Sequence, residues 1–346
     1  MSVLDLLKAR IASHGPLYFD EFMEAALYGP GGFFAGEVLR SVKGGDFLTS
    51  PEVSPLFGSS LAEFVRRERD RLGDPFRLVE AGAGSGSLLA PLLETVAVDA
   101  WAVEISPPAR LALERVLPTE RIVRSVAEAV GRGVVIANEL LDNLPMAIAV
   151  RRGEGWTEQS VAATGDGLEI VETEARVEVA EWAKRFSGPV GEGGLVEVQL
   201  AAAGWVEQVL DRLEAGALVV IDYGATAEDL ESRRTTGTLR TYRSHHLGPD
   251  PLYAPGETDI TADVNFTALL AVAEAAGASV ELHRQDDFLA ELGLREVMSE
   301  LRHEELDLAR SGDELARLQA RSRRTDADAL LNPRGLGDFR VLVARL

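Results

Sequence analysis

Three glycines alternate with other residues directly after a short apolar run. The segment VEAGAGSG covers residues 79–86, so Gly82, Gly84 and Gly86 occupy every second position. Glycine has no Cβ, and a backbone rich in it can turn tightly and approach a bound ligand closely. These three glycines are therefore candidate ligand-binding residues.

An acid follows at the spacing that a nucleoside site requires. Glu104 ends the next β-branched run, and Ser106-Pro107 then begins the following helix. A carboxylate at the end of this second strand can accept hydrogen bonds from both hydroxyls of a ribose. Strand, glycine loop, helix, strand and acid together predict a nucleoside-binding half-fold.

Two residues bear on the choice of nucleoside. A dinucleotide fingerprint has glycine or alanine where this chain has Ser87, and Glu80 stands ahead of the loop, where it would repel a pyrophosphate. An acid there suits a ligand that carries an ammonium and a sulfonium. S-adenosyl-L-methionine is the favoured cofactor, and NAD, with an oxidoreductase function, is the alternative.

Further polar residues follow two other expected strands. Asn138, Glu139 and Asp142 come after the fourth strand, and Asp222 and Tyr223 come after the fifth. Open α/β sheets bind ligands at the carboxyl ends of their strands, so these five residues are candidate catalytic residues. Alternatively, residues 138–142 are a helix N-terminus with dipole-complementing acids, and Asp222-Tyr223 is a strand-ending turn.

A long loop in the N-terminal region supplies a third group. Thr49, Ser50 and Pro51 lie near the end of the loop from Gly29 to Val53 and are polar or rigid. A loop of that length within a helical region is often functional, so these residues are expected to cover the cofactor. The alternative is a capping segment for a helix that starts at Ser54-Pro55.

The elements that must position these residues predict an α/β fold with a doubly wound sheet. Residues 1–75 form a helical N-terminal region, with one helix stopped by Gly15-Pro16 and another capped by Asp20. Residues 76–346 form the main domain, with insertions at about 146–214 and 286–337. In this domain short β-branched runs alternate with helical segments, as in βαβ units. The expected strands are Arg77–Glu80, Ala100–Glu104, Ile122–Arg124, Val134–Ala137, Leu218–Asp222, Ser279–His283 and Phe339–Ala344.

Composition narrows the class of protein. The chain has 346 residues, of which 46% are hydrophobic and 26% are charged, and its formal net charge is −21. Such a charge repels phosphate backbones, so no nucleic-acid partner is expected. The absence of cysteine excludes disulfides and thiolate metal sites. The adjacent His245 and His246 lack partners at ligand spacing, so no metal site is expected.

The sequence also gives expectations for the cellular location of the protein and for its oligomeric state. No apolar run reaches the ~18 residues of a membrane span. The first residues resemble neither a signal nor a transit peptide. The sequence therefore predicts a cytoplasmic protein with no membrane span. Inserted strands near 147–171 are expected to form either a contact in a homodimer or a lid.

Several blocks together resemble one family. They are GDFLTSPEVS at 45–54, the glycine loop, ANELLDNLP at 137–145, GTLR at 237–240, DITADVNF at 259–266 and LGDF at 336–339. In this order they resemble the MidA-like S-adenosylmethionine-dependent methyltransferases. That family includes the mitochondrial complex I assembly factor that methylates an arginine. Asn265 departs from it, because an acid is usual there.

The resemblance implies a class I, Rossmann-like methyltransferase whose substrate is a protein arginine, in the known member on a respiratory complex I subunit. It places Gly82, Gly84 and Gly86 against the cofactor and Glu104 on its ribose. A guanidinium is almost always protonated and would repel a cationic sulfonium. The acids after the fourth and fifth strands could hold it and accept its proton. A non-catalytic assembly factor that keeps the fold is the remaining alternative.

Overall fold

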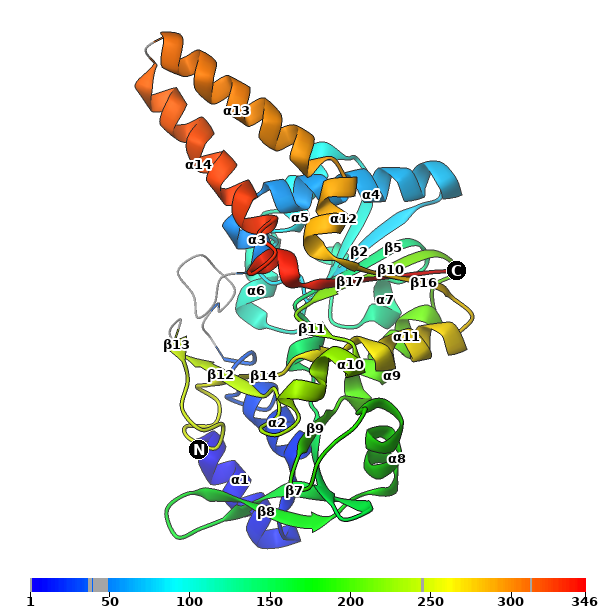
Figure 1. The fold of residues 1–346 in the computed structure, drawn as a ribbon, viewed down its shortest axis with the longest axis vertical. Helices are drawn as coiled ribbons and strands as arrows, with labels where there is room; N and C mark the ends of the chain where they lie inside the picture. The colour runs from blue at the N-terminus through cyan, green and yellow to red at the C-terminus, as the bar shows by residue number, and fades with distance from the viewer. Residues whose placement is uncertain (1, 37–38, 40–48, 244–245, 312) are drawn as a thin grey trace.

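The central feature of the fold is a seven-stranded sheet with the order β16-β17-β10-β5-β2-β3-β4 (Figure 1). It is seen in a computed structural model that describes residues 2–36, 39, 49–243, 246–311 and 313–346. Neighbouring strands from β10 to β4 are parallel, whereas β17 is antiparallel to both of its neighbours. The doubly wound α/β fold and all seven expected strands are thus confirmed: β2 (Arg77–Ala81), β3 (Asp99–Val103), β4 (Ile122–Val123), β5 (Arg132–Asn138), β10 (Ala215–Asp222), β16 (Ser279–Arg284) and β17 (Arg340–Arg345).

Helices cover both faces of this sheet because successive strand side chains point to opposite faces. Leu78 of β2 belongs to one apolar core and its neighbour Val79 belongs to the other. The first core contains side chains of α4 (Leu56–Leu72), α5 (Leu89–Thr95), α6 (Pro107–Leu113), α12 (Gln285–Glu291) and α14 (Glu314–Leu330). The second contains side chains of α7 (Val126–Ala129), α9 (Leu200–Leu210) and α11 (Phe266–Ala275).

The first insertion builds a second sheet with the order β1-β7-β6-β9, and β8 pairs with β7. The inserted strands expected near 147–171 are therefore present and pair antiparallel. Its strands are β1 (Leu17–Tyr18), β6 (Ala147–Arg152), β7 (Gly155–Ala163), β8 (Leu168–Glu174) and β9 (Leu195–Val198). The N-terminal helices α1 (Val3–His14) and α2 (Phe19–Leu27) share an apolar core with β6 and β7, and α8 (Val177–Phe186) shares another with β6 and β9.

Two expected helix starts are wrong by one or two residues. The N-cap of α2 is Tyr18 and not Asp20, because Glu21 accepts a hydrogen bond from the Tyr18 backbone N–H. Helix α4 begins at Leu56 with Pro55 as N-cap, one residue later than expected. Ser54 nevertheless contributes, since its Oγ accepts a hydrogen bond from the Leu56 N–H at 3.2 Å.

The second insertion is helical. Helices α13 (Leu294–Ser311) and α14 form a hairpin that projects away from the sheet (Figure 1). No helix among the described residues is long and apolar enough to cross a membrane. The remaining elements are α3 (Ser50–Val53), α10 (Ala227–Leu230), β11 (Gly224–Ala225), β12 (Arg240–Arg243), β13 (His246–Leu247), β14 (Asp259–Thr261) and β15 (Val264–Asn265), with 3-10 helices at Thr119–Arg121, Leu141–Asn143, Glu231–Arg233 and Leu336–Asp338.

Candidate cofactor and substrate site

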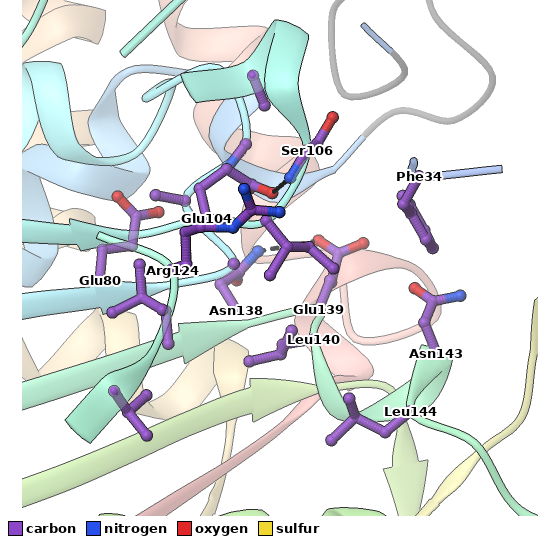
Figure 2. A pocket seen from close by; sticks show the side chains of 18 of the residues that line it. Phe34, Glu80, Glu104, Ser106, Arg124, Asn138, Glu139, Leu140, Asn143 and Leu144 are labelled. Atoms are coloured by element: carbon purple, nitrogen blue, oxygen red, sulfur yellow. Dashed lines mark hydrogen bonds between the residues drawn. The ribbon is translucent and has the colours of Figure 1, made fainter. Parts of the chain in front are cut away.

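A cavity of about 320 Å³ lies at the carboxyl ends of β2, β3, β4 and β5. This is the edge at which open α/β sheets bind ligands. Its lining comes from six parts of the chain: the N-terminal region, the glycine loop, the loop after β3, the loop after β4, the segment after β5, and α9. Figure 2 shows acidic side chains distributed along it.

The glycine loop lines the cavity with two of its three glycines. Gly82 and Gly84 have φ values of +70° and +52°, which favour glycine, and both line the cavity together with Ser87. Gly86 does not line it. A Cβ at Gly86 would lie 3.0 Å from Val116 and 3.1 Å from Leu113, so this glycine allows the loop to pack beside α6 and the residues that follow it. The expectation that Gly86 faces the ligand is not supported.

Glu104 is fixed at the end of β3 by the glycine loop itself. Its Oε2 accepts a hydrogen bond from the Gly84 N–H at 2.8 Å, and its Oε1 accepts one from the Ser106 N–H at 2.7 Å. Burial raises the pKa of Glu104, although these backbone N–H groups act in the opposite direction. The carboxylate is therefore oriented before any ligand arrives, as a ribose acceptor should be.

Glu80 is a buried acid at the same end of the cavity (Figure 2). Its side-chain Oε2 is buried and has no hydrogen-bond partner among the described residues. Burial, and then the charge of Glu104, raise its pKa well above the ordinary value. A buried acceptor without a partner is costly, so the site fits a ligand that brings a donor or a positive charge.

The five candidate catalytic residues are close in the fold but are not equivalent. Asn138 and Glu139 line the cavity, whereas Asp142, Asp222 and Tyr223 do not. Asp222 Oδ2 accepts hydrogen bonds from the Leu141 N–H at 3.0 Å and the Asp142 N–H at 3.3 Å.

Asp142 in turn accepts hydrogen bonds from the Tyr223 hydroxyl and, at 2.9 Å, from the Thr261 hydroxyl. Burial raises the pKa of Asp142 to about 6, although these two hydroxyls lower it. The hydrogen bonds of this group therefore hold the segment after β5 in place. The cavity is not lined by Asp142, Asp222 or Tyr223, so the structure assigns them a supporting position.

Glu139 is the acid that faces the middle of the cavity. Its φ of +49° is unusual for a residue with a side chain, and the surrounding contacts must hold it there. Its Oε1 accepts hydrogen bonds from the Ser50 N–H at 3.2 Å and from Asn138 Nδ2 at 3.3 Å. Burial, followed by the charge of Asp142, raises the pKa of Glu139 to about 8. A cationic ligand bound beside Glu139 would therefore stabilise its ionised form.

This shifted pKa predicts a cost to stability. Since the pKa in the folded state is about 8 and the ordinary value is 4.5, ionisation of Glu139 opposes folding progressively as the pH rises between these values. The variant Glu139→Gln should therefore have a higher free energy of unfolding than the wild type at pH 8 and a similar one at pH 4. Urea unfolding of both proteins across this pH range measures the difference, and an unchanged difference would contradict the shifted pKa.

The expected covering segment reaches the cavity in part. Thr49 and Pro51 line it, but Ser50 does not. Ser50 instead links two parts of the fold, because its N–H contacts Glu139 and its Oγ accepts a hydrogen bond from Gln285 Nε2 at 3.2 Å. The preceding residues 45–48 of the same sequence block lie outside the described residues.

Several lining residues were missed by the sequence argument. Arg124 and Ser125 directly follow β4, so the rule used for the other strand ends would have found them. Other lining residues belong to segments that reach the cavity through packing between distant parts of the chain. The sequence around these residues does not indicate a binding site. The missed lining residues include Tyr28, Phe34, Ile105, Arg124, Ser125, Val126, Asn143, Leu144, Trp205 and Gln208.

Two further expectations concern residues away from the cavity. Asn265 is buried and caps α11, since its side chain accepts a hydrogen bond from the Ala268 N–H, and it does not line the cavity. His245 lies outside the described residues. Within the part of the chain that the structure describes, no group of three or more candidate ligand side chains could hold a metal ion.

Comparison with known proteins identifies a family for this chain. Residues 57–283 match the model of the family described as "Putative S-adenosyl-L-methionine-dependent methyltransferase". A Burkholderia thailandensis protein with S-adenosyl-homocysteine bound has a similar structure, with a TM-score of 0.86, 30% sequence identity, and coverage of 99% of this chain and 92% of that one. A second crystal structure from the same organism gives a TM-score of 0.84 at 30% identity, covering 99% of this chain and 91% of the other.

Curated relatives match over nearly the whole chain. "Protein arginine methyltransferase NDUFAF7, mitochondrial" of Mus musculus is 28% identical, covering 96% of this chain and 81% of the relative. The Homo sapiens protein of the same name is also 28% identical, covering 96% and 80%. Because these relatives are named as mitochondrial proteins, the prediction of a cytoplasmic protein is contradicted and is withdrawn.

The NAD alternative also falls, since the matched family uses a different cofactor and the similar Burkholderia thailandensis structure has S-adenosyl-homocysteine bound. The chain is a member of the family of S-adenosyl-L-methionine-dependent methyltransferases.

Proposed function

We propose that this methyltransferase transfers a methyl group to an arginine side chain of a partner protein. The observation that carries the proposal is Glu139, an oriented acid that lines the cavity together with the glycine loop. The names of the curated relatives support arginine as the target. The net charge of −21 favours a protein substrate over a nucleic acid.

The proposed cofactor residues are those that line the glycine-loop end of the cavity. Gly82 and Gly84 would allow close approach of the cofactor, and Glu104 would hold its ribose hydroxyls. Glu80 would offset its positive charges. Thr49 and Pro51 would cover it from the N-terminal region.

The chemistry asked of the protein is mainly alignment and charge compensation. S-adenosyl-L-methionine supplies a methyl group on a cationic sulfur, and the protein must bring a guanidinium nitrogen in line with it. Glu139 would hold the guanidinium by charge-assisted hydrogen bonds and so offset its repulsion from the sulfonium. The pKa of Glu139 is about 8 in the absence of substrate, and a bound guanidinium would favour its ionised form. The ionised carboxylate would then accept the proton that methylation releases.

Replacement of Glu104 tests the cofactor end. Glu104→Ala should weaken binding of S-adenosyl-homocysteine by about 1–3 kcal/mol, because charged hydrogen bonds to the ribose are lost and the Gly84 and Ser106 N–H groups lose their acceptor. Isothermal titration of the variant and the wild type measures this difference. Equal affinities would place the ribose elsewhere.

The reaction itself is tested by the identity of its product. We further propose a respiratory complex I subunit as partner, on the resemblance to the assembly methyltransferases. The protein is incubated with methyl-labelled S-adenosyl-L-methionine and this subunit, which is then hydrolysed to amino acids. Labelled methylarginine is expected. Label on lysine or histidine would overturn the arginine assignment, and cofactor binding without any labelled product would favour the non-catalytic assembly factor.

A further inference from the structure

The cavity has a second end that the cofactor residues do not occupy. Phe34 and Asn143 lie on one side of Figure 2, Glu80 lies on the opposite side, and Glu139 stands between them. Tyr28 also lines this cavity. The residues of this end come from the segment after α2 and the segment after β5, so two distant parts of the chain build it together.

An aromatic pair forms one wall of this end. The rings of Tyr28 and Phe34 are stacked, with centroids 5.6 Å apart and planes inclined by 23°. Phe33 packs edge-on against Phe34 at 5.0 Å, and the Phe34 N–H donates to the Leu27 carbonyl at 2.9 Å. Both Tyr28 and Phe34 are only partly buried. The wall is therefore held in place and still presents aromatic surface to the cavity.

Asn143 supplies an oriented acceptor beside this wall. Its Nδ2 donates to Asp259 Oδ1 at 2.8 Å and to the Ile260 carbonyl at 3.1 Å. These two acceptors fix the amide, and its Oδ1 consequently lies on the side of Glu139 (Figure 2). The Tyr28 hydroxyl donates to the Asn143 carbonyl at 3.1 Å, which joins the acceptor to the aromatic wall.

Acidic side chains surround this end. Burial is the largest cause of a raised pKa at the Tyr28 hydroxyl, and the charges of Asp142 and Asp259 raise that pKa further. Glu139 adds a third carboxylate, which lines the cavity. An aromatic face next to carboxylates attracts a cation, and a flat cation gains most because it can stack on the ring.

We propose that Tyr28, Phe34 and Asn143 form the subsite that selects a guanidinium: the aromatic wall stacks on its plane, Asn143 Oδ1 accepts one of its N–H groups, and Glu139 accepts others. This inference rests on the proposed function and deepens it, because it names the residues that distinguish arginine from lysine. A lysine ammonium is compact and cannot lie flat on the wall while it donates in plane to both acceptors.

Small probes test the subsite without knowledge of the partner protein. The protein is saturated with S-adenosyl-homocysteine, and binding of Nα-acetyl-arginine methylamide is measured by isothermal titration or ligand-observed NMR. The matching lysine and citrulline compounds are measured in parallel, since lysine keeps the charge and citrulline keeps the shape. The arginine probe should bind about tenfold more tightly than either, in line with a desolvated cation–π contact.

Variants of Phe34 separate the aromatic contact from simple packing. Phe34→Leu keeps an apolar side chain but removes the ring, and it should weaken the arginine probe about fivefold or more. Phe34→Tyr restores the ring and should restore binding. Both variants should keep the wild-type affinity for S-adenosyl-homocysteine, which also shows that they are folded.

The outcomes distinguish this inference from the proposed function. Equal binding of the arginine probe to the wild type and Phe34→Leu, equal binding of all three probes, or binding of none to the saturated protein would each overturn the subsite. If labelled methylarginine is nevertheless formed in the product assay, the proposed function stands and only the subsite fails. Absence of S-adenosyl-homocysteine binding would overturn both.

Discussion

Replacement of Glu139 by glutamine should lower kcat/KM for methyl transfer by at least about 100-fold. The change keeps the size of the side chain and removes its charge, so the bound guanidinium is left beside the cationic sulfonium without compensation. Removal of one partner of a desolvated charge pair costs about 3 kcal/mol or more, and each 1.36 kcal/mol is tenfold in rate. Single-turnover transfer of a labelled methyl group to the protein substrate measures the loss.

Two observations keep this result interpretable. Binding of S-adenosyl-homocysteine should change little, because Glu139 contacts Ser50 and Asn138 and stands apart from Glu80 and Glu104. Glu24→Gln is a control for the loss of one acid: Glu24 is an exposed glutamate one turn before Tyr28, and it does not line the cavity. A Glu139→Gln variant as active as the control would remove Glu139 from the reaction.

Replacement of Gly84 by valine should weaken cofactor binding by about 100-fold or more. Gly84 has a φ of +52°, which a β-branched residue adopts only under strain, and it lines the cavity. Its N–H also orients Glu104, so any shift of the loop disturbs the ribose acceptor. Isothermal titration with S-adenosyl-homocysteine should show a loss of ~3 kcal/mol in binding free energy.

Gly153→Val separates this effect from general destabilisation. Gly153 has a φ of +54°, and a Cβ there would meet no atom of the described residues within 4 Å. It lies in the turn between β6 and β7, far along the chain from the glycine loop. The control therefore carries a similar backbone strain but should bind the cofactor normally. A parallel loss in both variants, or none in Gly84→Val, would contradict the role of the loop.

The central sheet was predictable because its signals are local. Strands such as β5 and β10 are buried on both faces and appear in the sequence as apolar runs followed by polar residues. The start of α5 also has a local signal, because proline is tolerated only near the beginning of a helix and Pro91 is the third residue of α5, which begins at Leu89. These features need only a few neighbouring residues to be recognised.

The second half of the site was less predictable because it depends on packing between distant segments. Helices α1 and α2 lie against the inserted sheet, which brings Tyr28 and Phe34 to the cavity. Nothing near Phe34 in the sequence indicates this contact. The acids after β5 were found, but only the structure shows that Glu139 faces the cavity while Asp142 supports the loop beneath it.

The placement of β17 has a consequence for how the molecule is made. Strand β17 lies inside the sheet between β16 and β10, and its residues Val341 and Leu342 belong to the cores on opposite faces. Until the ribosome has released residues 340–345, β10 has an unpaired edge and β16 has no partner in the sheet. The central sheet is therefore completed only after residues 340–345 have left the ribosome. Until then the strands already synthesised have exposed edges, which makes the nascent chain prone to aggregation.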